Sequence, residues 1–329
     1  MEDYPRTLGD LEARFSSEEA CRAYLFDLRW PDGFRCPRCG HAKAWPVARV
    51  RFQCASCGHQ ASVIAGTIFQ DTHKPLAMWF RVIWLVTSQK TGASALNLQR
   101  VLGLGSYKTA WAWLHKLRRA MVRPKRDRLS GRVEVDESYV VGLEEGTHGR
   151  GTAKKAIVAI AAAEGQAPLK VRPALTGVEE DGDGTGRIRM RRIANASAKE
   201  LHAFVEDAVE PGSLVHTDGW EGYTGLRKKG YKHKATPVKD RKASKVLPRV
   251  HKAASLLKRW LMGTHQGAVS REHLDHYLDE FTFRFSRRTS RYRGKLFCRL
   301  LQNAVAIEPA PFETLTRGSR GRKKRTPKG

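Results

Sequence analysis

The run Val133-Glu134-Val135-Asp136-Glu137-Ser138-Tyr139-Val140 largely alternates between apolar and polar side chains. This alternation predicts a β-strand that places Glu134, Asp136 and Ser138 on one face. Aspartate is disfavoured in the middle of a strand, so Asp136 is a candidate functional residue. The plainer interpretation is that Asp136 pairs with a nearby lysine.

A second acid lies at the end of another strand-like run, Leu214-Val215-His216-Thr217-Asp218-Gly219-Trp220. Two aspartates placed side by side can hold magnesium through their oxygen atoms. A pair of metal ions can then activate a water or hydroxyl and stabilise the departing oxygen of a phosphodiester. The alternative for Asp218 is an ordinary turn residue.

The surrounding sequence predicts that both acids belong to a domain of strands and helices. The predicted strands are residues 133–141, 156–162, 188–193 and 213–216, and the predicted helices are residues 197–209, 250–261 and 273–285.

Four cysteines form two Cys-x-x-Cys knuckles, separated by fourteen residues: Cys36, Cys39, Cys54 and Cys57. This spacing is typical of a closed, tetrahedral zinc site, in which the metal is structural. Gly40 and Gly58 follow the knuckles and tolerate a tight backbone path. Four unrelated thiols, or a site in which His41 or His59 replaces a cysteine, are the alternatives.

Residues 70–123 read as helical, and residues 95–121 fit a helix-turn-helix. Its second helix would bury Ala110, Leu114, Leu117 and Met121 and leave residues such as Lys108 and Arg118 on other faces. Such a helix could enter a DNA major groove. The alternative is an ordinary helical hairpin with a solvated basic face.

The formal net charge is +27, from 60 Lys and Arg against 33 Asp and Glu. Nucleic acid is the expected partner of such a chain, with an anionic membrane surface as the weaker alternative. No apolar run approaches the roughly 20 residues of a spanning helix. Residues 226–252 carry eleven basic residues against one acid, and residues 317–328 carry seven against none.

The chain start lacks a secretion signal, so we expect a cytoplasmic protein associated with the nucleoid.

Further motifs carry a resemblance. Four separate segments follow one another along the chain: 136–142 (DESYVVG), 217–223 (TDGWEGY), 257–265 and 277–285. They resemble the two aspartate motifs and the C-terminal signature of bacterial insertion-sequence DDE transposases, in the ISXO-like group related to eukaryotic Merlin elements. The zinc knuckles resemble the N-terminal ribbon of the same group.

The resemblance implies a ribonuclease-H-like α/β catalytic domain with a mixed sheet. It implies metal-dependent DNA cleavage and strand transfer at the ends of an insertion sequence. Magnesium or manganese would be held by Asp136, Asp218 and a third residue on a later helix. Lys258 would contact a phosphate near the scissile bond, and the alternative is a solvated helix lysine. The partners would be terminal inverted repeats and target DNA, with at least a dimer on DNA.

The third metal ligand departs from the group's pattern, because Leu256 stands where much of the group has Asn or Glu. His251 is one replacement, since it lies seven residues before Lys258 on the same helix face. A shifted acid is another, with Glu272, Asp279 and Glu280 as candidates. The third alternative is a catalytically inert protein.

The sequence therefore predicts a multidomain α+β protein. Its expected parts are an N-terminal helix and zinc ribbon (1–66), a helical DNA-binding segment (67–125), the catalytic domain (126–308) and a basic disordered tail (309–329). The competing functions are a catalytically inert zinc-ribbon DNA-binding regulator derived from a transposase, and a ribonuclease acting on RNA–DNA hybrids. The ribonuclease would share the fold and the metals but would leave the ribbon unexplained.

Overall fold

The computed structural model describes residues 4–47, 50–123, 126–140, 155–165, 184–237 and 246–316. It divides into two compact units, which are described separately. The terminal unit comprises Met1–Pro124 and Ser290–Gly329, and the central unit comprises Lys125–Thr289. None of the helices in the described ranges is long and apolar enough to cross a membrane.

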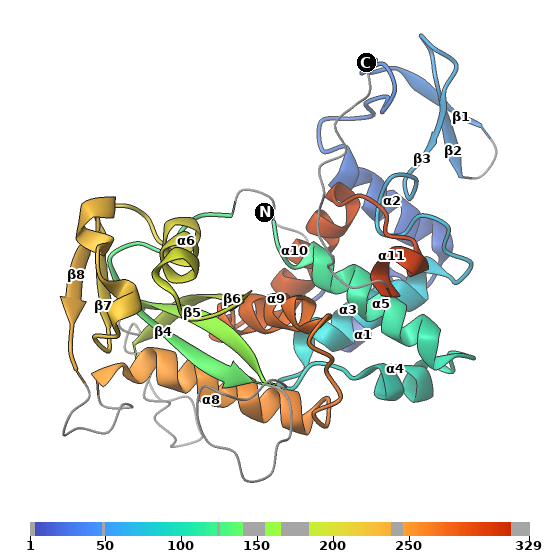
Figure 1. Ribbon diagram of the computed structural model, residues 1–329. Coiled ribbons are helices and arrows are strands. Elements are labelled where there is room, and N and C mark those ends of the chain that lie inside the picture. The colour runs from blue at the N-terminus through green and yellow to red at the C-terminus, as the bar shows by residue number, and fades with distance from the viewer. Residues whose placement is uncertain are drawn as a thin grey trace. The chain divides into compact units, whose positions relative to one another are not determined.

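The terminal unit begins with two short helices and a small sheet (Figure 1). The helices are α1 (Leu8–Arg14) and α2 (Glu18–Arg29), and the strands are β1 (Ala44–Val47), β2 (Arg51–Cys54) and β3 (Gln60–Ser62). The sheet is antiparallel in the order β1-β2-β3. The Arg29 guanidinium donates to the carbonyl oxygens of Ser62 and Val63 at 2.8 and 2.9 Å, which fastens the ribbon to α2.

A helical cluster completes the terminal unit: α3 (Leu76–Ser88), α4 (Ala95–Leu102), α5 (Tyr107–Ala120), α10 (Arg293–Ala306) and α11 (Phe312–Thr316). Helix α10 packs against α2, α3 and α5. Its buried Phe297 meets Phe80 with ring centroids 5.7 Å apart. The sequence analysis assigned residues 290–308 to the catalytic domain. They belong instead with the N-terminal helices, because the apolar face of α10 packs against α2, α3 and α5.

The predicted disordered tail also needs correction at its beginning. Residues 312–316 form α11, and Leu315 and Ala310 are buried against Ala112 of α5. Apolar contacts thus order the first part of the predicted tail 309–329, whereas the basic residues that suggested disorder all lie at 317–328. Residues 317–329 lie outside the described residues.

Helices α4 and α5 form the expected pair. Gly103 ends α4 in the left-handed region, and the Ser106 hydroxyl accepts the Lys108 N–H at 3.1 Å as the N-cap of α5. All four residues predicted to point inward are buried, three on α5 and the fourth, Met121, at its C-cap. Arg118 is buried too, at 1% exposure, contrary to expectation, and its Nη1 lies 3.2 Å from Nε2 of His115. Only the beginning of α5, at Tyr107 and Lys108, is well exposed.

The central unit is built on a five-stranded mixed sheet in the order β6-β5-β4-β7-β8 (Figure 1). The strands are β4 (Arg132–Val140), β5 (Ala156–Glu164), β6 (Thr185–Ile193), β7 (Leu214–Thr217) and β8 (Lys232–Ala235). Strand β4 is antiparallel to β5 and parallel to β7, and β7 is parallel to β8. The central strand β4 is therefore the predicted strand that carries Asp136.

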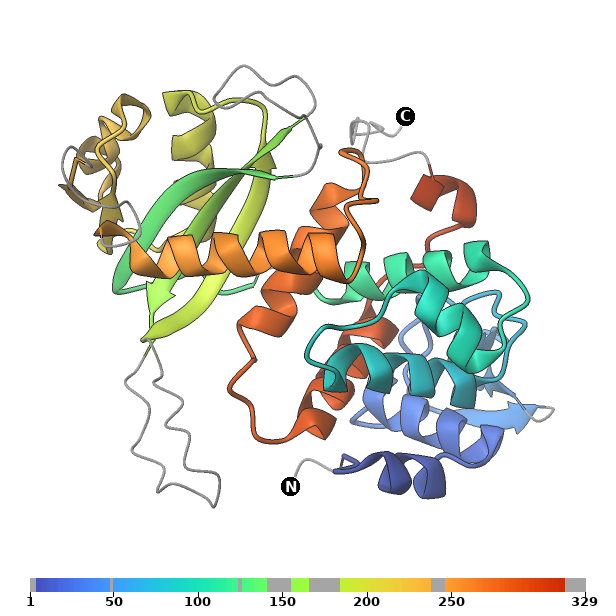
Figure 2. The same cartoon turned by 90° about the horizontal axis from the view of Figure 1, so that it is seen from below.

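Helices cover both faces of this sheet. On one face lies α6 (Ala198–Ala208), with the short 3-10 turns η1 (Glu221–Tyr223) and η2 (Leu226–Lys229) beside it. On the other face lie α8 (Pro248–Gly263) and α9 (Leu274–Phe285). Figure 2 shows α8, in orange, extending across its face of the sheet. The alternation of β4 sends Val133 and Val135 toward α6, so Asp136 lies on the α8 face. This three-layer arrangement is the expected ribonuclease-H-like fold.

Candidate functional site: two aspartates, a histidine and a lysine

The two predicted aspartates lie on neighbouring parallel strands. The register pairs Glu134 of β4 with His216 of β7, and Asp136 and Asp218 each follow two residues later. Asp218 comes directly after β7, where its Oδ1 accepts the Trp220 N–H at 2.9 Å. Continued in step, this register places Asp136, in the middle of β4, level with Asp218 just past the end of β7, and the charge of Asp218 acts on the Asp136 carboxyl.

His251 reaches this pair from helix α8. Its Nε2 lies 3.7 Å from Oδ2 of Asp136. Burial lowers the pKa of His251, with the charge of Lys258 acting in the same direction. A neutral imidazole keeps a nitrogen lone pair available for a divalent metal ion.

The electrostatics of Asp136 fit a cation site. Burial raises the pKa of its carboxyl to about 7, and the negative charges of Glu137 and Asp218 add to the rise. Lys258 opposes it, so Lys258 lies close enough to act on the same carboxyl. Partly buried carboxylates that repel one another are stabilised by a bound divalent ion, and oxygen-rich sites suit magnesium or manganese.

Lys258 and His251 lie on the same side of α8, seven residues apart. Burial lowers the pKa of Lys258, and Lys155 adds to this effect. His251 therefore approaches Asp136 directly, and the charges of Asp218 and Lys258 both act on the Asp136 carboxyl.

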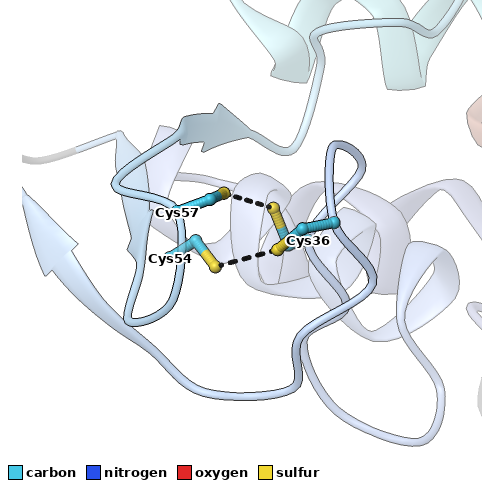
Figure 3. A group of neighbouring side chains, drawn as sticks. Cys36, Cys54 and Cys57 are labelled. Atoms are coloured by element: carbon cyan, nitrogen blue, oxygen red, sulfur yellow. Dashed lines mark hydrogen bonds between the residues drawn. The ribbon is translucent and has the colours of Figure 1, made fainter.

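The four knuckle cysteines also converge. Their sulfur atoms all lie within 4.8 Å of one another. The Sγ atoms of Cys36 and Cys57 are 3.7 Å apart (Figure 3). Those of Cys39 and Cys54 are 3.6 Å apart. Four sulfurs about 2.3 Å from a central zinc ion would be about 3.8 Å apart in a tetrahedron. The thiols are thus arranged as a structural zinc site requires.

The two knuckles share one backbone pattern. The Cys36 N–H donates to the carbonyl of His41 at 2.9 Å, and the Cys54 N–H donates to the carbonyl of His59 at 2.9 Å. Gly40 has a positive φ of 76° in the first knuckle, and the second knuckle repeats this with its own glycine. The histidines therefore close the knuckles through their backbone carbonyls, and the four cysteine sulfurs are the group that could hold a metal ion.

Comparisons with known proteins agree with this geometry. Residues 128–286 match the family described as the ISXO2-like transposase domain, and residues 16–60 match the transposase zinc-ribbon domain. The chain carries the two domains of an insertion-sequence transposase. It is 28% identical over 295 residues to a protein of Halobacterium salinarum named "Uncharacterized protein in transposable element ISH50". That similarity covers 82% of this chain and 91% of the relative.

Two acidic residues that the sequence offered as the third metal ligand of this transposase lie on a different helix from His251. Asp279 and Glu280 belong to α9, which packs against β6, whereas Asp136 is on β4 with β5 between them. Glu280 is fully buried and lies 3.5 Å from Arg284 on its own helix. Leu256, at the position where a ligand was expected, packs against the apolar cluster between α8 and the sheet. Glu272 is exposed in the turn before α9. Of the candidates for a third ligand, His251 is the one whose side chain contacts Asp136 at a measured 3.7 Å.

Two supporting residues of the transposase, Lys155 and Tyr223, were not predicted from the sequence. Lys155, just before β5, acts electrostatically on Lys258. The buried Tyr223 hydroxyl donates to Oε2 of Glu137 at 2.9 Å, which holds that carboxylate on the face opposite Asp136. Tyr223 lies within the TDGWEGY segment, so the motif contained this signal. His265, the last residue of the signature segment 257–265, packs edge-on against Trp260 and Tyr277.

Proposed function

We propose that this transposase cleaves DNA at the ends of its insertion sequence and joins the freed 3′-hydroxyl to target DNA. The observation that carries the proposal is the approach of His251 on α8 to Asp136 on β4, the strand that pairs with β7 and so with the strand that Asp218 follows. The family assignment supports the same reaction class. Both steps are displacements at phosphorus, so one site can serve both.

The roles follow from the donor set. Asp136 and Asp218 would hold magnesium or manganese through carboxylate oxygens, with His251 as a nitrogen ligand. When bound, the metal supplies charge stabilisation for the attacking and leaving oxygens. Lys258 would bind a phosphate oxygen near the scissile bond, which orients the strand and offsets its charge. The repulsion between the clustered carboxylates keeps the site ready for a cation.

DNA recognition is assigned to the terminal unit. The zinc ribbon and the exposed beginning of α5, at Tyr107 and Lys108, would bind the terminal inverted repeats. The strong positive charge would make the binding salt-dependent. Two paired element ends imply at least a dimer during catalysis.

A second candidate function is a catalytically inert DNA-binding regulator. Leu256 supports it, because this leucine packs against the apolar cluster at the position where a metal-binding side chain was expected. This protein would keep the ribbon and bind the element ends without cleaving them.

Cleavage of the element's own ends separates the two functions. The ends are found as inverted repeats flanking the reading frame and bordered by a short direct duplication. Purified full-length protein would be incubated with a labelled duplex carrying one end, in magnesium and in manganese. Nicking at the end of the repeat supports the transposase. Tight binding without nicking in either metal supports the regulator.

A further inference from the structure

Helix α8 begins with a cap supplied from a distant strand. Leu247 is the N-cap residue and makes no side-chain cap, and Pro248 has no N–H to satisfy. The next two N–H groups, of Arg249 and Val250, donate to Oε2 of Glu134 at 2.7 and 3.1 Å. One carboxylate on β4 thus satisfies both donors that the first turn of α8 leaves open.

The Arg249 side chain reinforces this attachment. Its Nη1 donates to Oε1 of Glu134 at 2.8 Å, its Nη2 donates to Glu164, and its Nε donates to the carbonyl of Gly184 at 3.2 Å. These partners belong to β4, to the end of β5 and to the residue before β6. The side chain of Glu134 is 1% exposed and that of Arg249 is 14% exposed. The pair is therefore a buried, charge-assisted contact between α8 and one end of the sheet.

This contact lies one step from the proposed metal site. Glu134 and Asp136 are two residues apart on the same face of β4, about 6.6 Å along the strand. His251 directly follows Val250, and its own N–H donates to the Leu247 carbonyl at 3.1 Å. The position of the capped turn therefore sets where the His251 imidazole lies relative to Asp136.

We propose that Glu134 and Arg249 form a clamp that positions the His251 imidazole against Asp136. The proposal rests on the proposed function, since the position of His251 matters for cleavage only if His251 and Asp136 hold metal. Glu134 and Arg249 are positioning residues in this account. Arg249 also belongs to the basic stretch 226–252, so one basic residue of that stretch serves an internal contact and not DNA.

A double-mutant cycle tests whether Glu134 acts through His251. The full-length variants are Glu134→Gln, His251→Ala and the double variant, and manganese affinity is measured by the loss of the free-ion electron paramagnetic resonance signal. We expect Glu134→Gln to weaken manganese binding about tenfold, as losses of supporting contacts at metal sites do. The double variant should bind no more weakly than His251→Ala alone. Additive losses would show that Glu134 acts independently of His251 and would overturn the proposal.

The matched control is Glu164→Gln. It removes another carboxylate from Arg249 but leaves both N–H groups of α8 capped, so manganese affinity should stay within about twofold of wild type. An equal loss in Glu164→Gln and Glu134→Gln would contradict the clamp, because general weakening of Arg249 would then explain both. If Glu134→Gln does not unfold cooperatively, Glu134→Asp keeps the charge and shifts the cap by one methylene, and an intermediate loss is expected.

A metal-free measurement separates the clamp from the proposed function. The imidazole signal of His251 is assigned in ¹⁵N-histidine-labelled protein by its disappearance in His251→Ala. It should move in Glu134→Gln and remain in place in Glu164→Gln. A signal that stays in place in both variants would overturn the clamp. Wild-type protein that binds no manganese would instead overturn the proposed metal site, while the imidazole signal would still report on the clamp.

Discussion

The imidazole Nε2 of His251 lies 3.7 Å from Oδ2 of Asp136, although one residue is on a helix near the end of the central unit and the other on its central strand. The distance suits two ligands of one metal ion, because two donors each about 2.0–2.2 Å from an ion lie about 3–4 Å apart. Burial also lowers the pKa of the imidazole, which favours its neutral form. A histidine can thus replace the ligand that Leu256 does not provide.

Asp136→Asn and Asp218→Asn should each abolish strand cleavage while DNA binding persists. The amide keeps the shape of the side chain but loses the charge that holds the cation. Residues that merely support metal ligands are worth about 10- to 100-fold, so removal of a ligand should cost more than this. Gel assays of end cleavage and of end binding check the two parts. Robust cleavage by Asp136→Asn would contradict the proposal that Asp136 holds the catalytic metal.

His251→Ala should reduce cleavage nearly as far as the aspartate variants. Asp279→Asn and Glu280→Gln should be mild in the same assay, since α9 packs over β6 and not over β4. Manganese should restore part of the activity of weakened sites better than magnesium, because manganese accepts nitrogen ligands more readily. A mild His251→Ala and a severe Asp279→Asn would assign the third ligand to α9 instead.

Cys39→Ser should remove the zinc from the terminal unit and unfold the ribbon. The strands β1–β3 are three or four residues long, so the ribbon has little apolar core without its metal. Metal analysis should find one zinc per chain in wild type and much less in the variant. Cys298→Ala is the control, because Cys298 is buried on α10 outside the cluster. Unchanged zinc content in Cys39→Ser would refute the four-sulfur site.

Local patterns were sufficient to predict the central strand and the cysteine cluster. Alternation along residues 132–140 sets which face Asp136 occupies, and the two-residue spacers of the knuckles dictate that the thiols converge. The separation of seven between His251 and Lys258 likewise fixes their common helix face. These features depend on neighbours along the chain, which a sequence pattern contains.

Long-range partners were not predictable in the same way. Nothing near Glu134 in the sequence indicates that it caps α8, because its partner Arg249 lies 115 positions away. Helix α10 has an apolar face that would fit any domain, and only the fold shows that it packs on α2, α3 and α5. The buried Arg118 was mistaken for a surface residue because helical spacing does not reveal how many sides of α5 are covered.

Asp279 should make the central unit less stable as pH rises. Burial raises the pKa of its carboxyl to about 7, and the charge of Asp275 adds to this effect. An unfolded aspartate titrates near 3.9, so between about pH 4 and pH 7 the native state binds more protons and the free energy of unfolding falls with pH. Each pH unit in this window is worth up to about 1.4 kcal/mol.

Asp279→Asn should flatten that dependence and make the protein more stable than wild type at pH 8. Urea unfolding at pH 5, 6, 7 and 8 in metal-free buffer measures it. Asp207→Asn, at an exposed position on α6 paired with Arg191, should leave the slope unchanged. Parallel stability curves for Asp279→Asn and wild type would show that this carboxyl does not titrate differently in the two states.

Phe297→Ala should destabilise the terminal unit and spare the central one. Phe297 is fully buried and packs with Phe80 and Trp84, so truncation leaves a cavity that costs about 3–5 kcal/mol. Phe283→Ala on α9 is the matched variant in the central unit, where Phe283 is 2% exposed. Zinc release into a chromogenic chelator during urea unfolding follows the terminal unit, since the four cysteines belong to it. Zinc release should shift to lower urea in Phe297→Ala and stay in place in Phe283→Ala. The opposite pattern would return α10 to the catalytic domain, where the sequence had placed it.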